Sequence, residues 1–475
     1  MSTLAAQDAT MYWLSSRTRN DLFLLYCFDD SGRPSVELRE FVARRSARIA
    51  DLRVRLHELP RDLDYPSWVR CDFRAEQFVE HFLPEANWPG VCTAVGKLLG
   101  TGVDAAVRPW RLHVFRGIDG APRGGPGPAM VVVLQLSHAL ADGRRGTEIA
   151  RALFAESDPV EPAAAARDSI AAALGVRGRR IGTAARELAP VSAIHVDSAL
   201  ALLRMPLRIA RTAVLGYHAF LAQRELAELT TAGKIPEPGP GFAPSPVNRP
   251  GALHGNRPYD AHQVRMIICD AVRMRIPGHT VTVVALTAVS IALDRYLTAR
   301  GEQVDRLGAQ VPMALSGNRI AARNNYRSLG VELFIDEPEP LARADRIAAA
   351  LADRRIRAHH PLLTAQDRVT AVTPAPLLRR DVDRYPIDTV PDSIAGHTVV
   401  SSVHRGPADL TFGGASVRFT GGFPAIGSVM HLTHGVHGLG DTVTVSVHAN
   451  TAVLPDIDTY TDLLRAALNE VCVPR

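Results

Sequence analysis

The stretch MVVVLQLSHALADGRRGTEIARALF (Met130–Phe154) places a histidine directly after an apolar run. The run Met130–Ser137 predicts a buried strand, and the residues that follow Asp142 predict a helix. His138 therefore lies at the end of a strand, where a rigid scaffold fixes the direction of a side chain. Two interpretations are open: a structural histidine that its neighbours satisfy, or a general base.

The residues around His138 suit proton transfer. Imidazole titrates near neutrality, so His138 could remove a proton from a hydroxyl. Asp142 is too close in sequence to be taken as a triad partner, and we expect its carboxylate to fix the turn through an arginine or backbone N–H groups. We expect Gly143 to adopt a backbone conformation that is closed to other residues. The sequence has no Gly-x-Ser-x-Gly elbow, which favours direct transfer over a covalent intermediate.

The chain on both sides of this stretch alternates strand-like and helix-like segments. Helices are predicted at Pro34–Leu52, near Val281–Leu297 and at Asp456–Cys472. Strands are predicted at Asp21–Phe28, Arg111–Ile118, His262–Ala271, Leu307–Leu315, Ser328–Ile335, His397–His404, Ala415–Phe423 and Asp441–Ala449. This order predicts a mixed α/β fold built from two related halves.

A helical segment and a linker separate the two halves. Ser198–Leu229 is helical in pattern, although Pro206 is expected to kink or interrupt it. Arg204, Arg208 and Arg211 share one face of this segment, which fits either a membrane surface or a solvated face. The Pro/Gly-rich stretch Gly233–Gly251 then excludes regular structure.

The composition is that of a globular protein. The chain has 475 residues, of which 46% are hydrophobic, and a net charge of +5. This charge is mild over such a length, and no dense basic block is present, so nucleic acid is not an expected partner. The five cysteines form no Cys-x-x-Cys pair, which argues against a disulfide framework and favours a cytoplasmic location.

A second His-x-x-x-Asp match, His437–Asp441, lies in the Gly-rich sequence HGVHGLGD. We interpret His437 as a loop residue without a chemical step. His431, His434 and His437 are spaced by three, but no carboxylate accompanies them on a clear helix, so no metal site is expected.

Several segments, in order along the chain, resemble the bacterial wax ester synthase/diacylglycerol acyltransferase family. SHALADG (Ser137–Gly143) resembles the His-His-x-x-x-Asp-Gly signature that acyl-CoA-dependent acyltransferases share with condensation domains. LAAQDATMYWL looks like the family's opening segment with its aspartate. RPWRLHVFRGI resembles its Pro-Leu-Trp-x-x-His segment, with Trp110 and His113 in place.

The resemblance continues through the second half. SPVNRPG resembles the family's linker exit, and DTVTVSVHANTAVLPDIDTYTDLLRAALNEV is similar to its final strand and helix. PMALSGNRIAARNNYRSLGVELFI looks like the segment that holds a Gly-Asn-Arg element, here Gly317, Asn318 and Arg319. These three residues and Trp110 are candidate substrate-binding residues. From the residues alone, Trp110 also fits a core position, and the Gly-Asn-Arg element also fits a turn.

The resemblance implies two chloramphenicol-acetyltransferase-like mixed-sheet domains with the active site in a tunnel between them. Residues 1–185 would form the N-terminal acyltransferase domain, 186–245 a helical and Pro/Gly-rich linker, and 246–475 the C-terminal domain. The implied enzyme moves a fatty acyl group from acyl-CoA to a lipid alcohol, with diacylglycerol giving triacylglycerol as the leading case. His138 would be the catalytic base, and Asp142 and Gly143 would support it.

The same resemblance implies partners and departures. Acyl-CoA is the expected co-substrate, no cofactor or metal is expected, and the protein would contact a membrane or lipid droplet peripherally. The first histidine of the signature is replaced by Ser137, and the family's Asn-Asp pair falls at Thr282 and Val283. Two alternatives therefore stay open: an enzyme that acylates another alcohol, such as a wax ester alcohol or a polyketide hydroxyl, and a weakened member that only binds lipid.

Overall fold

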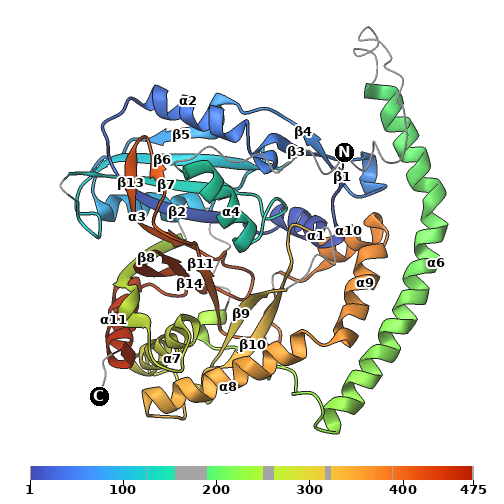
Figure 1. Cartoon of the computed structure of the whole chain (residues 1–475). Coiled ribbons are helices and arrows are strands. Elements are labelled where there is room, and N and C mark those ends of the chain that lie inside the picture. Colours follow the sequence, from blue (N-terminus) through green and yellow to red (C-terminus); the bar gives the residue numbers. More distant parts are fainter. Residues whose placement is uncertain are drawn as a thin grey trace.

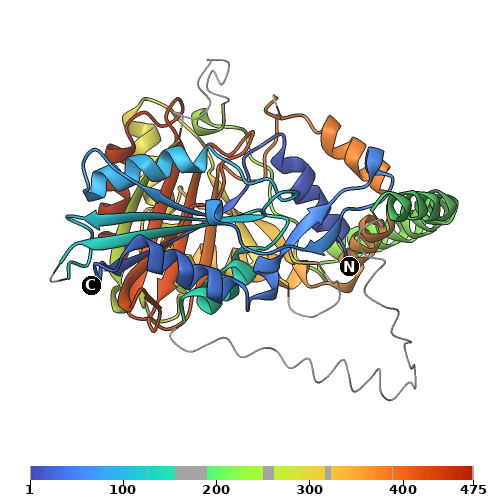
Figure 2. The ribbon, with the colours of Figure 1, turned by 90° about the horizontal axis from the view of Figure 1, so that it is seen from above.

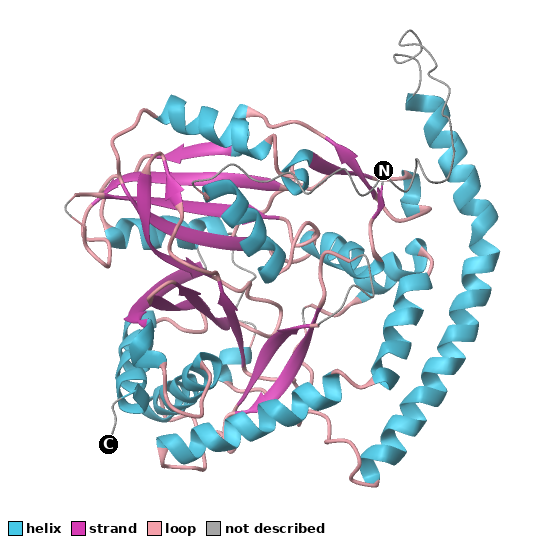
Figure 3. Ribbon diagram, in the orientation of Figure 1, coloured by secondary structure: helices cyan, strands magenta, loops and turns pink. Residues whose placement is uncertain are grey.

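The computed structural model describes residues 2–125, 127–155, 190–249, 262–315, 322–387 and 389–472. These residues form two six-stranded sheets and one small three-stranded sheet, with helices on the outer faces of the large sheets (Figures 1 and 3). Both large sheets contain parallel and antiparallel pairs. The predicted mixed α/β class with two mixed sheets is confirmed. The predicted boundary between residues 185 and 186 lies outside the described residues.

The first large sheet carries the stretch with His138. Its strand order is β12 (Thr411–Phe412), β13 (Ala415–Gly422), β2 (Leu22–Asp29), β7 (Ala129–Leu136), β6 (Trp110–Ile118) and β5 (Phe78–His81). All of β7 is buried, because helices cover both faces of the sheet. Helices α2 (Ser35–Ser46) and α4 (Gly143–Phe154) cover one face, and α3 (Trp88–Leu99) covers the other.

The second large sheet forms the C-terminal half. Its strand order is β10 (Tyr326–Glu332), β9 (Gly308–Ala314), β11 (Thr398–His404), β14 (Leu432–Leu439), β15 (Thr442–Asn450) and β8 (His262–Asp270). Its core is completed by α7 (Val281–Ala299), α8 (Pro340–Ala358) and α11 (Ile457–Cys472). Among the described residues, α7 is the one helix long and apolar enough to cross a membrane, and most of it is buried in this core.

Two features join the halves. Strands β12 and β13 come late in the chain, yet β13 pairs with β2 and so extends the first sheet. Helix α3 packs between the first sheet and β8 of the second. A Cβ at Gly96 on α3 would lie 2.6 Å from the carbonyl oxygen of His262 on β8, so the close approach of these elements requires glycine.

A layer of short elements lies between the first sheet and the long helix α6 at the edge of the molecule (Figures 1 and 2). It comprises β1 (Ser2–Thr3), α1 (Ala6–Ser15), β3 (Val54–His57), β4 (Ser67–Arg70), α9 (Thr364–Val372) and α10 (Ala375–Arg384). Helix α6 (Pro190–Thr231) continues through Pro206, so the expected interruption does not occur. Proline removes one helical hydrogen bond, and the Ala, Leu and Arg residues around it are strong helix formers.

The prediction that His437 lies in a loop is wrong. His437 belongs to β14, which pairs with β11 and β15 along its length. The glycines that suggested a loop serve close packing instead. A Cβ at Gly435 would lie 2.2 Å from the carbonyl oxygen of Gly422 on β13, so glycine is needed where the two sheets meet.

Substitution of Phe412 tests whether the late strands hold the first sheet together. Phe412 is fully buried, and its ring lies 5.5 Å from that of Phe154 and 5.9 Å from that of Phe28, between centroids. We expect Phe412→Ala to lower the free energy of unfolding by about 3–5 kcal/mol, because it removes a large side chain from a packed core. Chemical denaturation measures this. Phe82→Ala, at an exposed position, is the control, and equal small effects of both variants would contradict the prediction.

Candidate active site

The turn after β7 places His138 between the two halves of the protein. Strand β7 ends at Leu136, and helix α4 begins at Gly143. Asp142 caps this helix, since its Oδ1 accepts a hydrogen bond from the backbone N–H of Arg145 at 2.9 Å. Its Oδ2 accepts from the backbone N–H of Asn325, in the other half, at 3.2 Å. The carboxylate therefore fixes the turn through backbone N–H groups of both halves.

The expectation for Gly143 is wrong. Gly143 is the first residue of α4 and does not have the positive φ that only glycine adopts readily. A Cβ at this position would lie 3.4 Å from Cγ2 of Val403 on β11. This is an ordinary van der Waals distance, so neither the backbone conformation nor the approach of β11 requires glycine at this position.

His138 as a whole residue is partly exposed. Its Nδ1 is buried and has no hydrogen-bond partner among the described residues. Burial lowers the pKa of His138 below its usual value of 6.5, although Asn324 and Asp142 act in the opposite direction. The ring centroid lies 6.1 Å from that of Tyr326 on β10. The histidine is thus neutral over a wider range of pH than a free imidazole.

A buried polar network holds the backbone of His138. The side-chain Nδ2 of Asn324 donates to the carbonyl oxygen of His138 at 2.7 Å and to Oδ1 of Asp8 at 2.9 Å. Asp8, on α1, is 1% exposed, and it also accepts from the backbone N–H groups of Arg323 and Asn324, each at 2.9 Å. Burial raises the pKa of Asp8, and these hydrogen bonds counteract that rise.

An ion cluster surrounds the other side of the same turn. Arg323 Nη1 donates to Asp51 Oδ1 at 2.7 Å and to the carbonyl oxygen of Leu140 at 3.3 Å. Arg145 donates to both oxygens of Asp51, at 2.8 and 3.0 Å. Such a bidentate pair fixes orientation as well as charge. Residues from the first half and the segment before β10 together therefore clamp the turn that carries His138.

The residues at the two departures from the family pattern have defined contacts in the structure. Ser137 is buried, and its Oγ accepts from the backbone N–H of Ala139 at 3.3 Å, so its hydroxyl supports the turn. Thr282 Oγ1 donates to Ser402 Oγ at 3.0 Å. Side chains of Ser402 and Val403 point to opposite faces of β11, so Thr282 and Gly143 contact opposite faces of that strand. Val283 lies in the core of the C-terminal half.

The remaining candidates are placed as follows. Trp110 is 1% exposed, and its Nε1 donates to the carbonyl oxygen of Leu52 at 3.0 Å, which is the packing of a core residue; a role in substrate binding stays a prediction. Gly317, Asn318 and Arg319 lie outside the described residues. Within the described part of the chain, no cluster of His, Cys, Asp or Glu could hold a metal ion, and His434 on β14 instead contacts the hydroxyl of Tyr460 at 2.8 Å.

Sequence reasoning missed the residues that position His138. Asp8 is the aspartate of the recognised segment LAAQDATMYWL, and Asn324 lies in the recognised segment RNNYRSLG, but neither was assigned a role. They are 316 positions apart, so no local spacing brings them together. The one available signal was the pair of asparagines a few residues before the predicted strand Ser328–Ile335, in a connecting segment of the kind where polar side chains commonly serve a site.

The sequence of this chain matches two family models, and both matches agree with the fold described above. Residues 4–284 match the family model described as the wax ester synthase/diacylglycerol acyltransferase catalytic domain, and residues 308–471 match the WS/DGAT C-terminal domain. No curated protein matches the chain.

Two solved structures are similar over nearly the whole chain. The wax ester synthase/diacylglycerol acyltransferase from Marinobacter aquaeolei VT8 has a TM-score of 0.61 at 17% identity, covering 99% of this chain and 98% of that one. A mutant starter condensation domain of rhizomide synthetase in complex with C8-CoA and Leu-SNAC has a TM-score of 0.51 at 13% identity, covering 99% and 94%. At these identities the likeness shows the fold.

The pKa of His138 can be measured directly. We expect its imidazole to titrate below pH 6.5, because burial disfavours the charged ring. NMR of protein labelled at the histidine Cε1 position gives the titration curve, and the signal missing from His138→Gln assigns it. A midpoint at or above 6.5 for that signal would contradict the burial described here.

Proposed function

The chain belongs to the wax ester synthase/diacylglycerol acyltransferase family, and on that premise we propose that it transfers a fatty acyl group from acyl-CoA to a lipid alcohol. Diacylglycerol is the leading acceptor, with triacylglycerol as the product. The observation that carries the proposal is the position of His138: a partly exposed histidine with a lowered pKa, on a turn that both halves hold.

His138 acts as the general base in this proposal. Its Nδ1 is buried, which leaves Nε2 as the nitrogen available to a substrate. Nε2 removes the proton of the acceptor hydroxyl while the oxygen attacks the thioester carbonyl. The carbon–sulfur bond of the tetrahedral intermediate then breaks, and the imidazolium returns its proton to the leaving CoA thiolate. The products are an ester and CoA, and the reaction balances with no cofactor besides the co-substrate.

Positioning supplies the rest of the catalysis. Two substrates that meet at one imidazole gain from proximity only when that imidazole is held in place. The carbonyl oxygen of His138 is bound by Asn324, and Asp142 caps the next helix and binds Asn325. The base thus sits where the two halves meet, consistent with substrates that reach it through a tunnel between them.

Two further considerations support the substrate classes. A condensation domain of the same fold has been solved with C8-CoA, which makes an acyl-CoA a reasonable donor for this chain. Diacylglycerol and triacylglycerol are poorly soluble in water, so the enzyme would work in peripheral contact with a membrane or a lipid droplet. A wax ester alcohol or a polyketide hydroxyl would use the same base and the same leaving group.

A thiol-release assay identifies the acceptor. Purified protein is incubated with palmitoyl-CoA and, in turn, with diacylglycerol, hexadecanol or a soluble secondary alcohol, and free CoA is measured. We expect the highest kcat/KM with diacylglycerol. His138→Ala should lower turnover by about 100-fold or more with every acceptor, which is the contribution of a general base, while the protein stays folded.

Other outcomes of this assay have definite meanings. Preference for hexadecanol would replace diacylglycerol as the acceptor and leave the chemistry intact. Bound acyl chains without CoA release for any acceptor would overturn the proposal in favour of a lipid-binding protein. Unchanged turnover in His138→Ala would exclude this histidine as the base.

Asn324 is a positioning residue in this proposal. Asn324→Ala removes the hydrogen bond to the carbonyl oxygen of His138 and leaves the buried carboxylate of Asp8 with one fewer donor. We expect kcat to fall by about 10- to 100-fold, since small displacements of a catalytic group cost this much, with little change in KM. Asn469→Ala, at an exposed position on α11, is the control. A rise in KM at unchanged kcat would show that Asn324 serves binding instead.

A further inference from the structure

Helix α6 presents an apolar face to the outside of the molecule. It lies along one edge, apart from the two large sheets (Figures 1 and 2). Between Leu202 and Leu221 it carries large apolar side chains that are 40–77% exposed. They are Leu202, Leu203, Leu207, Ile209, Val214, Tyr217, Phe220 and Leu221. We call this set the outer face of α6. Single exposed apolar residues are ordinary, but a contiguous set of this size marks an interaction site.

The helical spacing shows that these residues lie together. Leu203, Leu207, Val214 and Leu221 follow one another at intervals of four, seven and seven, which is one line along a helix. The opposite side of α6 packs against the body of the protein. Three residues on that side are buried: Ala219, Ala222 and Leu226. Thr212 Oγ1 donates to the carbonyl oxygen of Val372, at the C-terminal end of α9, at 3.3 Å. Arg357 on α8 donates to Thr230 Oγ1 at 2.8 Å. The outer face is therefore not needed for packing.

The charges beside this face are positive. The segment Leu202–Leu221 contains Arg204, Arg208 and Arg211 and no Asp or Glu. Arg208 forms an ion pair with Asp64. Arg204 and Arg211 are exposed and have no ion-pair partner among the described residues. The segment is about 30 Å long at 1.5 Å per residue, so it offers an extended apolar strip with unpaired cations beside it.

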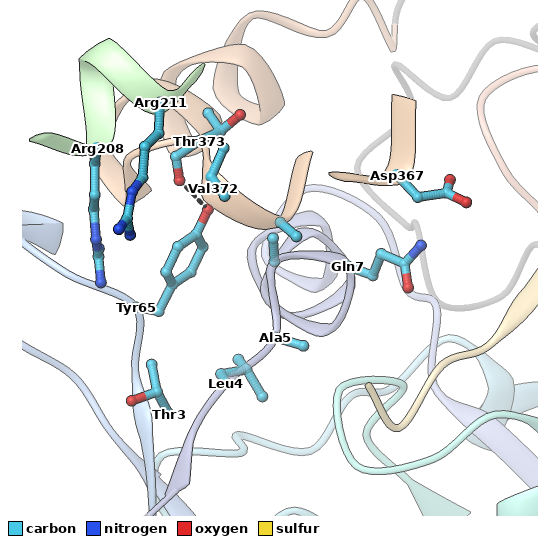
Figure 4. A pocket seen from close by; sticks show the side chains of 12 residues that line it. Thr3, Leu4, Ala5, Gln7, Tyr65, Arg208, Arg211, Asp367, Val372 and Thr373 are labelled. Carbon is cyan, nitrogen blue, oxygen red and sulfur yellow. Dashed lines mark hydrogen bonds between the residues drawn. The ribbon is translucent and has the colours of Figure 1, made fainter. Parts of the chain in front are cut away.

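A cavity lies beneath α6, and two of these arginines line it. Arg208 and Arg211 reach from α6 toward Tyr65, whose hydroxyl donates to the carbonyl oxygen of Thr373 (Figure 4). Together with residues of β1, α1 and α9 they line a cavity of about 390 Å³. The guanidinium of Arg211 thus lies at the junction of the helix and the body, where a polar headgroup could reach it while the outer face contacts acyl chains.

We infer that the outer face of α6 binds the surface of an anionic lipid layer, with its long axis parallel to that surface. Leucine, valine and aromatic side chains enter the boundary between headgroups and acyl chains, and the arginines bind the phosphates. A second copy of this chain fits less well, because a two-fold contact would place this cationic segment against itself with no acidic residue to pair with. The inference rests on the proposed function, which makes a lipid surface relevant to this protein. The exposed residues of α6 locate the contact on the molecule.

Vesicle binding by the full chain tests this without turnover. The probes are vesicles of phosphatidylcholine alone and of phosphatidylcholine with phosphatidylglycerol, and bound protein is measured by flotation. We expect binding to the anionic vesicles that weakens with added salt. Leu203→Glu/Val214→Glu should lower the partition coefficient by about tenfold or more, because it places charge in the apolar face. Phe82→Glu/Val272→Glu, at exposed positions elsewhere, is the matched control and should bind as the parent protein does.

Three results would overturn the inference. One is binding by the α6 variant equal to that of the parent protein. Another is loss of binding by the control to the same extent. The third is a dimer in light scattering that the α6 substitutions convert to a monomer, since a second copy would then cover the face. Thiol release with diacylglycerol, hexadecanol and the soluble alcohol, measured on the same variants, keeps this test separate from the chemistry: its absence in the parent protein with every acceptor would contradict the proposed function and not the lipid contact.

Discussion

The carboxylate of Asp8 is the group on which the site depends. It is buried, and it is balanced by two backbone N–H groups and one amide N–H from the segment before β10. An unpaired buried carboxylate is costly, so removing these donors would favour separation of the two halves at this point. Because Asn324 uses its second amide proton on the carbonyl oxygen of His138, the same arrangement that joins the halves also sets the position of the base.

The packing of the two sheets brings the residues of this network together. Strand β7 is buried over its whole length between helices, and a strand held on both faces has little freedom at its end. Strand β13 closes the first sheet from the C-terminal part of the chain, and α3 fills the space between the sheets. These contacts fix how the halves meet, and the segment before β10 can then reach the turn after β7.

Local patterns predicted the local structure well. The strand, turn and helix around His138 follow from apolar runs and a capping aspartate, and these signals act over a few residues. The Asp8–Asn324 contact was not predicted, because it depends on the arrangement of two sheets. Two other expectations failed. The Gly-rich sequence around His437 suggested a loop, whereas Gly435 lies in a strand and allows the close approach of β13. Gly143 does not have the positive φ that was expected of it.

The way His138 is held bears on its chemistry. In a triad, a carboxylate binds the imidazole and stabilises its charged form. Here the carboxylate of Asp142 accepts from backbone N–H groups, and Asn324 binds the backbone of the histidine. The backbone of the base is thus held in place, and within the described part of the chain no carboxylate is hydrogen-bonded to the ring. Burial then dominates and lowers the pKa. A base of this kind is neutral and ready when the alcohol arrives, and its imidazolium is a stronger acid that readily returns the proton to a departing thiolate.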